Sequence, residues 1–189
     1  MPYSKDHIKT VRQRILDCAG RLFRERGYAG VGIDTIMAEA GLTRGGFYAH
    51  FKSKADLFAQ MAGEPFDFAN QLERLAEHPP NGVADRTAYA MSFYLNAEKR
   101  DQNAAACTMA SSAVDVNRNG PAAKAAFGAQ VVEVADKIAQ LRVQDLKDGQ
   151  PTQALSDLCL AVGALVLARA SDDDTAKRIL SAALQQLGD

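Results

Sequence analysis

IDTIMAEAGLTRGGFYAHFKSKADL, residues 33–57, is the stretch that decides the fold of this chain. Its apolar residues have the spacing of the buried sides of two short helices, and a turn at Gly41 separates them. These residues are Ile33, Ile36, Met37 and Ala40 in the first helix, and Phe47 and Phe51 in the second. Two short helices around a glycine turn predict a helix-turn-helix motif.

The second of these helices, residues 44–50, has a composition that favours contact with DNA. Gly45 and Gly46 each cost a helix about 1 kcal/mol relative to alanine, but they let the backbone approach a groove or a phosphate closely. Thr43 at the helix start adds a hydroxyl and free amides for an anion. Hydrogen-bond donors surround this face, namely Arg44, Tyr48, His50, Lys52 and Lys54. Such donors are expected to position the helix in the major groove, where one or two of them read base edges.

The flanking sequence predicts more helices. Residues 9–26 carry an amphipathic stripe that Gly27 ends. Ser53 and Asp56 form a capping box for a helix that reaches about Glu77, with a kink expected at Pro65. Further helices are predicted over residues 83–99, 104–116, 122–147, 152–170 and 173–187. The expected fold is all-α, with about nine helices: a three-helix DNA-binding domain over residues 1–52, joined to a larger helical domain over residues 53–189.

Charge divides the chain unevenly. The first 60 residues carry ten Lys or Arg and six Asp or Glu, a net charge of +4, whereas the remainder carries −5. A basic end is suited to a polyanion, although a solvated basic face is an alternative explanation.

Several classes of site and location are disfavoured by the sequence. Cys18, Cys107 and Cys159 are too scattered for a disulfide framework or a zinc site, so no metal and no cofactor are expected. We find no nucleophile with a base, no paired carboxylates and no phosphate-binding loop, which predicts that the chain is not an enzyme. The apolar run Leu158–Ala168 is short for a membrane span, and no secretory signal is recognisable, so we expect a cytoplasmic protein without a membrane segment.

Three segments together resemble the TetR family of bacterial transcriptional repressors. They are FRERGY (residues 23–28), IMAEAG (36–41) and GGFYAHFKSK (45–54), whose aromatic, glycine and lysine positions match in register. The resemblance implies that Thr43, Arg44, Gly45 and Gly46 face DNA. It further implies that Tyr48 and Lys54 hold phosphates, and that Thr35 and His50 lie near the DNA backbone.

Two positions depart from the family pattern. Gly32 stands where the family usually has a Ser or Thr cap, which costs little. Gly46 stands where a small hydroxyl residue is common, which reduces the base contacts that the helix can make. A purely structural role is the alternative for Tyr48, as an aromatic that seals the domain, and for Lys54, as a solvated lysine.

Beyond residue 61 the family resemblance is loose, and it implies an effector-binding and dimerisation domain. Candidate ligand-binding residues are Phe66, Met91, Tyr94, Cys107, Ser111, Asp115 and Phe127. Cys107 is either a reactive sensor thiol or a small buried apolar residue. In the family the last two helices pack as a four-helix dimer interface. The apolar residues available for it are Leu155, Leu158, Cys159, Val162, Leu165, Val166, Ile179, Leu180 and Leu184.

The leading hypothesis is a homodimeric repressor that binds a pseudo-palindromic site in double-stranded DNA and is released by an unknown small-molecule effector. One alternative is a small helical ligand carrier or enzyme whose basic end is incidental. Another is an architectural DNA-binding protein without an effector, which salt-dependent binding without sequence preference would reveal.

Overall fold

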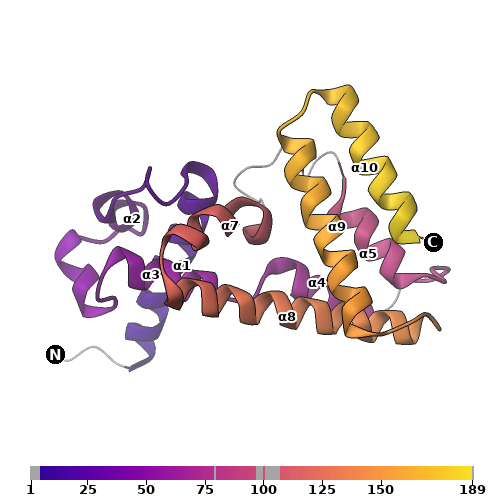
Figure 1. Ribbon diagram of the computed structural model, residues 1–189. Coiled ribbons are helices and arrows are strands. Elements are labelled where there is room, and N and C mark those ends of the chain that lie inside the picture. Colours follow the sequence, from indigo (N-terminus) through magenta and orange to yellow (C-terminus); the bar gives the residue numbers. More distant parts are fainter. Residues whose placement is uncertain (1–4, 79, 97–99, 101–106, 189) are drawn as a thin grey trace. The chain divides into compact units, whose positions relative to one another are not determined.

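The computed structural model describes residues 5–78, 80–96, 100 and 107–188, and in this part of the chain it contains nine α-helices, one 3₁₀ helix and no β-strand (Figure 1). The predicted all-α class is therefore confirmed. In chain order the helices are α1 (Lys5–Arg26), α2 (Ile33–Glu39), η1 (Arg44–Ala49), α3 (Lys54–Ala62), α4 (Asp67–Glu77), α5 (Arg86–Tyr94), α7 (Thr108–Arg118), α8 (Pro121–Gln144), α9 (Pro151–Arg169) and α10 (Asp173–Gly188).

The described residues fall into two compact units. The N-terminal unit comprises the residues up to Glu64 together with Ser112–Phe127, and the C-terminal unit comprises Pro65–Ser111 and the residues from Gly128 onward. Helices α7 and α8 each contribute residues to both units. The predicted boundary after residue 52 concerns function and stays a prediction; in the packing, α3 belongs with α1, against which it lies.

Aromatic rings dominate the core of the N-terminal unit. Phe23 of α1, Phe47 of η1 and Phe58 of α3 are each at most 1% exposed. The Phe23 and Phe58 rings meet edge to face, with centroids 5.2 Å apart, a geometry that adds to the stabilisation from burial. Val116 and Ala123, from α7 and α8, belong to the same cluster. The three-helix motif is thus completed by residues more than fifty positions downstream.

The two turns of the motif require glycine. Gly27 ends α1 with a φ of +70°, and Gly41 follows α2 with a φ of +66°. Side chains with a Cβ rarely adopt this left-handed conformation. The predicted end of the first helix at Gly27 and the predicted turn at Gly41 are both confirmed.

The predicted recognition helix is present but has the tighter 3₁₀ geometry. It covers Arg44–Ala49, one residue less than predicted, and the Thr43 side chain makes no capping hydrogen bond. Two adjacent glycines weaken the α-helical form, and short 3₁₀ segments are common in such connections. The Thr43 hydroxyl is consequently left for another partner.

The predicted capping box at the start of α3 is confirmed. The Ser53 hydroxyl accepts a hydrogen bond from the Asp56 amide at 3.0 Å, and the Asp56 carboxylate reaches back to the Lys52 amide at 2.8 Å. The predicted kink at Pro65 is a complete break, because α3 ends at Ala62 and α4 begins at Asp67. Proline lacks an amide donor and disfavours a helical conformation in the residue before it.

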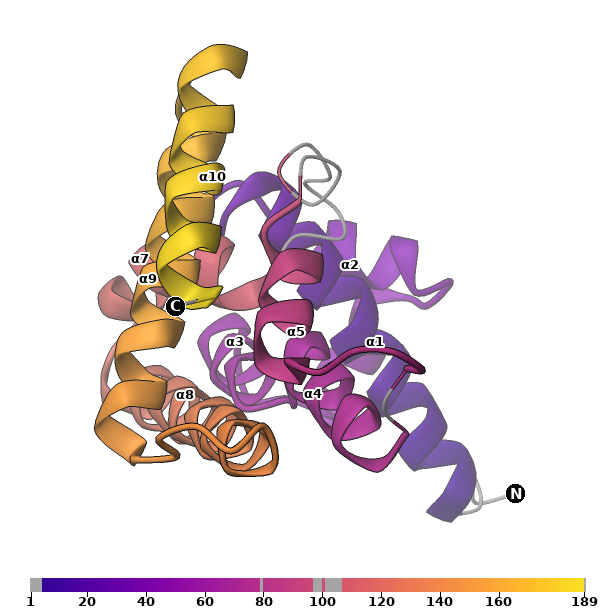
Figure 2. The same ribbon diagram turned by 90° about the vertical axis from the view of Figure 1, so that its right-hand side faces the viewer.

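In the C-terminal unit, α9 and α10 lie side by side, as Figure 1 and Figure 2 both show. Among the described helices, α9 alone is long and apolar enough to cross a membrane by length and composition, a feature that the sequence analysis did not anticipate. Asp157 of α9 is buried, and its carboxylate pairs with Arg142 of α8 at 2.6 Å. A buried charge with such a partner is typical of a helix packed within a protein.

Candidate nucleic-acid interface and ligand cavity

The helix-turn-helix segment presents a polar, exposed side around the buried Phe47. Thr43, Arg44, Gly45 and Tyr48 are all exposed, and Tyr48 is 60% accessible. The Tyr48 ring rests edge-on against Phe47, with centroids 5.3 Å apart. Phe47 therefore anchors η1 in the core, while its neighbours remain accessible to a partner.

Arg44 is already engaged in an ion pair at the surface. Its guanidinium lies 2.7 Å from a carboxylate oxygen of Asp34, and both side chains are more than 60% exposed. Exposed pairs of this kind contribute about 0–1 kcal/mol, so Arg44 can exchange Asp34 for another acceptor at little cost. A phosphate or a guanine edge offers such an acceptor.

Gly46 and His50 are half-buried, which distinguishes them from the exposed residues of η1. A Cβ at Gly46 would lie 3.7 Å from the end of the Met37 side chain, an ordinary contact distance. The Nδ1 atom of His50 is buried and has no hydrogen-bond partner among the described residues. Thr35, on α2, is exposed.

Lys54 is bound within the N-terminal unit. Its Nζ donates hydrogen bonds to the backbone carbonyls of Tyr28 and Val31, each at 2.8 Å. The same atom lies 4.1 Å from the centroid of the Tyr28 ring, within the range of a cation–π interaction. The resemblance implied a phosphate contact for Lys54, whereas in this structure its ammonium group holds the turn between α1 and α2.

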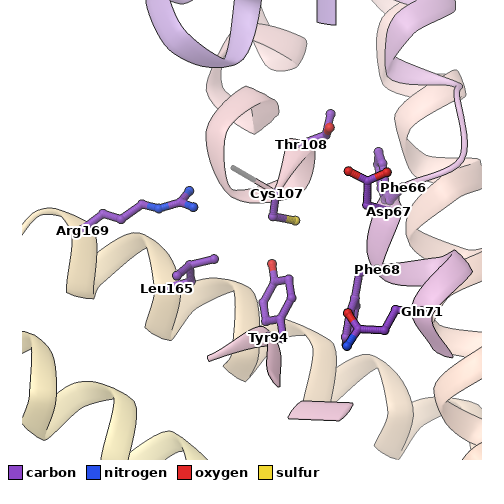
Figure 3. Close-up of a pocket in the computed structure, with 9 residues that line it drawn as sticks. All are labelled: Phe66, Asp67, Phe68, Gln71, Tyr94, Cys107, Thr108, Leu165 and Arg169. Atoms are coloured by element: carbon purple, nitrogen blue, oxygen red, sulfur yellow. The ribbon is translucent and has the colours of Figure 1, made fainter. Parts of the chain in front are cut away.

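The C-terminal unit contains a separate cavity of about 50 Å³. Because one water molecule needs about 10–15 Å³ of such a cavity, there is room for a small molecule. Figure 3 shows its walls, which come from α4, α5, α9 and the start of α7. The lining residues are Phe66, Asp67, Phe68, Gln71, Tyr94, Cys107, Thr108, Leu165 and Arg169.

Tyr94 supplies the most unusual polar group of this cavity. Its side chain is 5% exposed, and the hydroxyl has no hydrogen-bond partner of normal geometry in the described part of the chain. Figure 3 shows the hydroxyl pointing toward Cys107. Burial, and secondarily the neighbouring Cys107, raise the pKa of Tyr94 well above its usual value, so the phenol stays protonated. A buried donor without a partner is suited to a ligand that accepts a hydrogen bond.

The structure brings three of the seven candidate ligand-binding residues to the cavity: Phe66, Tyr94 and Cys107. Met91 is fully buried in the core, and the Ser111 hydroxyl donates to the Cys107 carbonyl at 2.8 Å. Asp115 and Phe127 lie in the N-terminal unit instead, where Phe127 packs against the aromatic core. The sequence analysis missed Asp67, Gln71, Thr108 and Arg169; only the i, i+4 spacing of Leu165 and Arg169 was available as a signal.

The candidate dimer residues divide into three groups by their exposure. Leu158, Leu165 and Leu180 are buried within the protomer, whereas the side chains of Ile179, Leu184 and Val162 are half-buried. Leu155, Cys159 and Val166 are exposed and, with Val162, follow one side of α9 at spacings of three and four residues. This outer group is named the α9 stripe below. Its apolar surface has no partner within the described protomer.

Residues 15–61 match the family described as bacterial regulatory proteins, tetR family. These residues form a DNA-binding segment of the TetR family. The matched segment contains the aromatic core, both glycine turns and the exposed η1 residues described above.

Two known regulators match this chain over part of their length. The regulator AcrR of Shigella flexneri is 43% identical over 58 residues, which are 31% of this chain and 27% of AcrR. The biofilm-operon negative regulator IcaR of Staphylococcus aureus is 28% identical over 91 residues, 48% of this chain and 49% of IcaR. The match thus spans about a quarter to a half of these TetR relatives.

Solved TetR structures resemble the whole fold. The reduced form of Escherichia coli NemR superposes with a TM-score of 0.79 at 18% identity, covering 94% of this chain and 95% of NemR. At this identity the likeness concerns the fold alone. The likeness in fold includes the helices of the C-terminal unit as well as residues 15–61.

Proposed function

We propose that this chain is a sequence-specific DNA-binding regulator that acts as a homodimeric repressor and responds to a small-molecule effector. The observation that carries the proposal is the exposed set Thr43, Arg44, Gly45 and Tyr48 on a segment anchored by the buried Phe47. An anchored segment with free donors and a bare glycine backbone is suited to the major groove. We expect the protein to act in the cytoplasm, where it meets chromosomal DNA.

The α9 stripe supports the dimer. Leu155 and Val166 are 39% and 41% exposed, and Leu167 beside them is 59% exposed. Isologous packing of α9 and α10 from two subunits would bury these side chains. A dimer presents two η1 segments to two half-sites related by twofold symmetry, which requires a pseudo-palindromic operator.

The cavity supports the effector. Its lining combines aromatic and aliphatic side chains with polar and charged ones, and the Tyr94 hydroxyl is a buried donor without a partner among the described residues. Apolar walls with a few polar groups are usual for a small-molecule site. The predicted ligand contacts of Phe66, Tyr94 and Cys107 belong to this proposal. For release from DNA, the effector must bind the DNA-incompetent state more tightly than the DNA-bound state. IcaR, with which part of this chain aligns, is a negative transcriptional regulator, which is consistent with repression.

The test is selection of bound duplexes from a random pool by the full chain, without added ligand and at about physiological salt. Enrichment of a pseudo-palindrome is expected, together with a dimer mass in solution. Enrichment of no sequence despite salt-dependent binding would favour an architectural protein. A folded protein that retains no DNA would contradict the proposal and favour the carrier alternative.

A further inference from the structure

The backbone of one residue of the N-terminal unit, Tyr28, is held by two side chains of opposite charge. Its amide donates to the Asp115 carboxylate at 2.7 Å, and its carbonyl accepts from the Lys54 ammonium at 2.8 Å. Hydrogen bonds to charged groups are stronger than bonds between neutral groups. The backbone of Tyr28 is therefore fixed at both its amide and its carbonyl by residues distant in the sequence.

Tyr28 lies at the junction that orients the helix-turn-helix. Tyr28 directly follows the end of α1, and the Lys54 ammonium also binds the carbonyl of Val31 just before α2. The Tyr28 ring packs against Phe58 of α3, with centroids 5.0 Å apart. Helix α2 contacts η1 in turn. A shift of the Tyr28 backbone would thus change the orientation of α2 and of the η1 residues that α2 contacts.

Asp115 approaches this junction from outside the matched family segment, from the third turn of α7. A Cβ on Gly27 would come within 3.4 Å of the same carboxylate oxygen that Tyr28 binds. The glycine at the end of α1 therefore provides the left-handed turn and also the space for the Asp115 carboxylate. Both the positive φ of Gly27 and its lack of a Cβ therefore allow the Asp115 carboxylate to reach the turn.

The other end of α7 begins at the cavity. Cys107 and Thr108, immediately before and at its first residue, line the cavity wall. From Thr108 to Asp115 the rise of a continuous α-helix is about 10 Å. Because the helix is held by its own backbone hydrogen bonds, a displacement of its first turn is transmitted to its third.

We infer that Asp115 is a positioning residue for operator binding, through which α7 communicates the state of the cavity to the backbone of Tyr28. The inference rests on the proposed function, because it assumes that η1 contacts DNA. Asp115 itself contacts no DNA in this account. Its carboxylate fixes the turn before α2, and residues at the start of its helix line the cavity.

The first experiment measures operator affinity in full-length variants, using the duplex recovered from the selection. Asp115→Ala removes the acceptor, and Asp115→Asn keeps a neutral oxygen that can still accept from Tyr28. Asp136→Ala, an exposed carboxylate on α8, is the matched control. We expect at least a tenfold loss of affinity per folded molecule for Asp115→Ala, a smaller loss for Asp115→Asn and none for the control.

Thermal unfolding of each variant separates positioning from stability. A merely structural role would lower the melting temperature of Asp115→Ala and leave the affinity of its folded fraction within threefold of the unsubstituted protein. That result would overturn the inference. If Asp115→Ala does not fold, the same criteria apply to Asp115→Asn, whose retained acceptor keeps the turn closer to its native geometry.

The second experiment is a double-mutant cycle that mimics an occupied cavity. Thr108→Phe places a ring in the cavity at the first residue of α7. We expect it to change operator affinity by at least threefold in the unsubstituted background and by much less with Asp115→Ala. No effect in the unsubstituted background, or the same factor in both, would overturn the inference. Failure of the unsubstituted protein to bind any duplex would instead refute the proposed function, so the two failures are distinguishable.

Discussion

The guanidinium of Arg44 and the carboxylate of Asp34 form a 2.7 Å ion pair across the exposed side of the helix-turn-helix. If Arg44 contacts DNA as proposed, a phosphate or a base acceptor has to replace this carboxylate, whose negative charge also repels the DNA backbone. DNA and Asp34 would then compete for the Arg44 guanidinium.

Asp34→Asn should strengthen DNA binding. The substitution releases Arg44 from a pair worth about 0–1 kcal/mol, so the expected gain reaches about fivefold and grows at low salt. Arg44→Ala should weaken binding and relax sequence preference at one position, by about 1–3 kcal/mol against the preferred base. Titration of operator and mismatched duplexes measures both effects, with Arg74→Ala as an exposed arginine control in the C-terminal unit. Weaker binding by Asp34→Asn would contradict the competition.

Lys52 and Lys54 are expected to separate into different roles. Lys54 is held by two backbone carbonyls, so Lys54→Ala should lower the free energy of unfolding by about 1–3 kcal/mol. Lys52 is exposed, and Lys52→Ala should leave stability within about 0.5 kcal/mol. If Lys54 binds no phosphate, its substitution leaves the salt dependence of DNA affinity unchanged. A slope reduced by about 0.9, the contribution of one phosphate contact, would instead support the role implied by the family resemblance.

Tyr48→Phe should weaken binding to all duplexes about equally. Tyr48 is exposed and packs on Phe47 through its ring, so removal of the hydroxyl leaves the anchor intact. One lost hydrogen bond to a phosphate corresponds to about 1.5–3 kcal/mol. Affinity for operator and random duplexes measures the loss, and unchanged thermal unfolding is the control. Affinity unchanged on both duplexes would argue for a purely structural Tyr48.

Acid should destabilise the start of α3 through Asp56. Hydrogen bonds from the Lys52 amide and the Gln60 side chain lower the pKa of Asp56 below its usual value. A carboxyl whose pKa is depressed by folding contributes stability above about pH 4, the ordinary pKa of aspartate, and loses it as the pH falls through the lower folded pKa. Asp56→Asn should therefore cost about 0.3–1 kcal/mol at neutral pH and flatten the acid limb of the stability curve. Parallel curves for the two proteins would exclude this origin.

Tyr94→Phe should stabilise the ligand-free protein. The buried hydroxyl has no partner of normal geometry in the described residues, so its removal should raise the free energy of unfolding by about 1 kcal/mol. Tyr89→Phe, at an exposed position on the same helix, is the matched control and should have no effect. Denaturant unfolding decides the point, because a loss of stability in Tyr94→Phe would mean that the hydroxyl is satisfied.

Local patterns in the sequence predicted the helix-turn-helix well. The pairing of Ser53 with Asp56, the turns at Gly27 and Gly41, and the burial of Phe47 each depend on spacings of a few residues. Periodicity and capping chemistry act over this range. The 3₁₀ form of η1 was missed because the cost of two glycines favours no particular alternative geometry.

Local sequence patterns could not predict contacts between segments that are distant in the sequence. The partner of Tyr28 lies 87 residues away, at Asp115, and the partners of Lys54 are carbonyls, which no side-chain pattern reports. Asp67 and Arg169 meet at the cavity only because α4 and α9 pack into one unit. Asp115 was predicted as a ligand contact, whereas it lies in the N-terminal unit and accepts a hydrogen bond from the Tyr28 amide.

The discontinuous N-terminal unit has a consequence for synthesis on the ribosome. Val116 and Ala123 belong to the core of this unit, and they are translated long after the helix-turn-helix has emerged. Domains generally fold as units during translation. The apolar side of the nascent helix-turn-helix that packs on Val116 and Ala123 therefore stays exposed until these residues leave the exit tunnel. Completion of the DNA-binding unit thus comes late in the life of the nascent chain, although its signature stands at the start of the sequence.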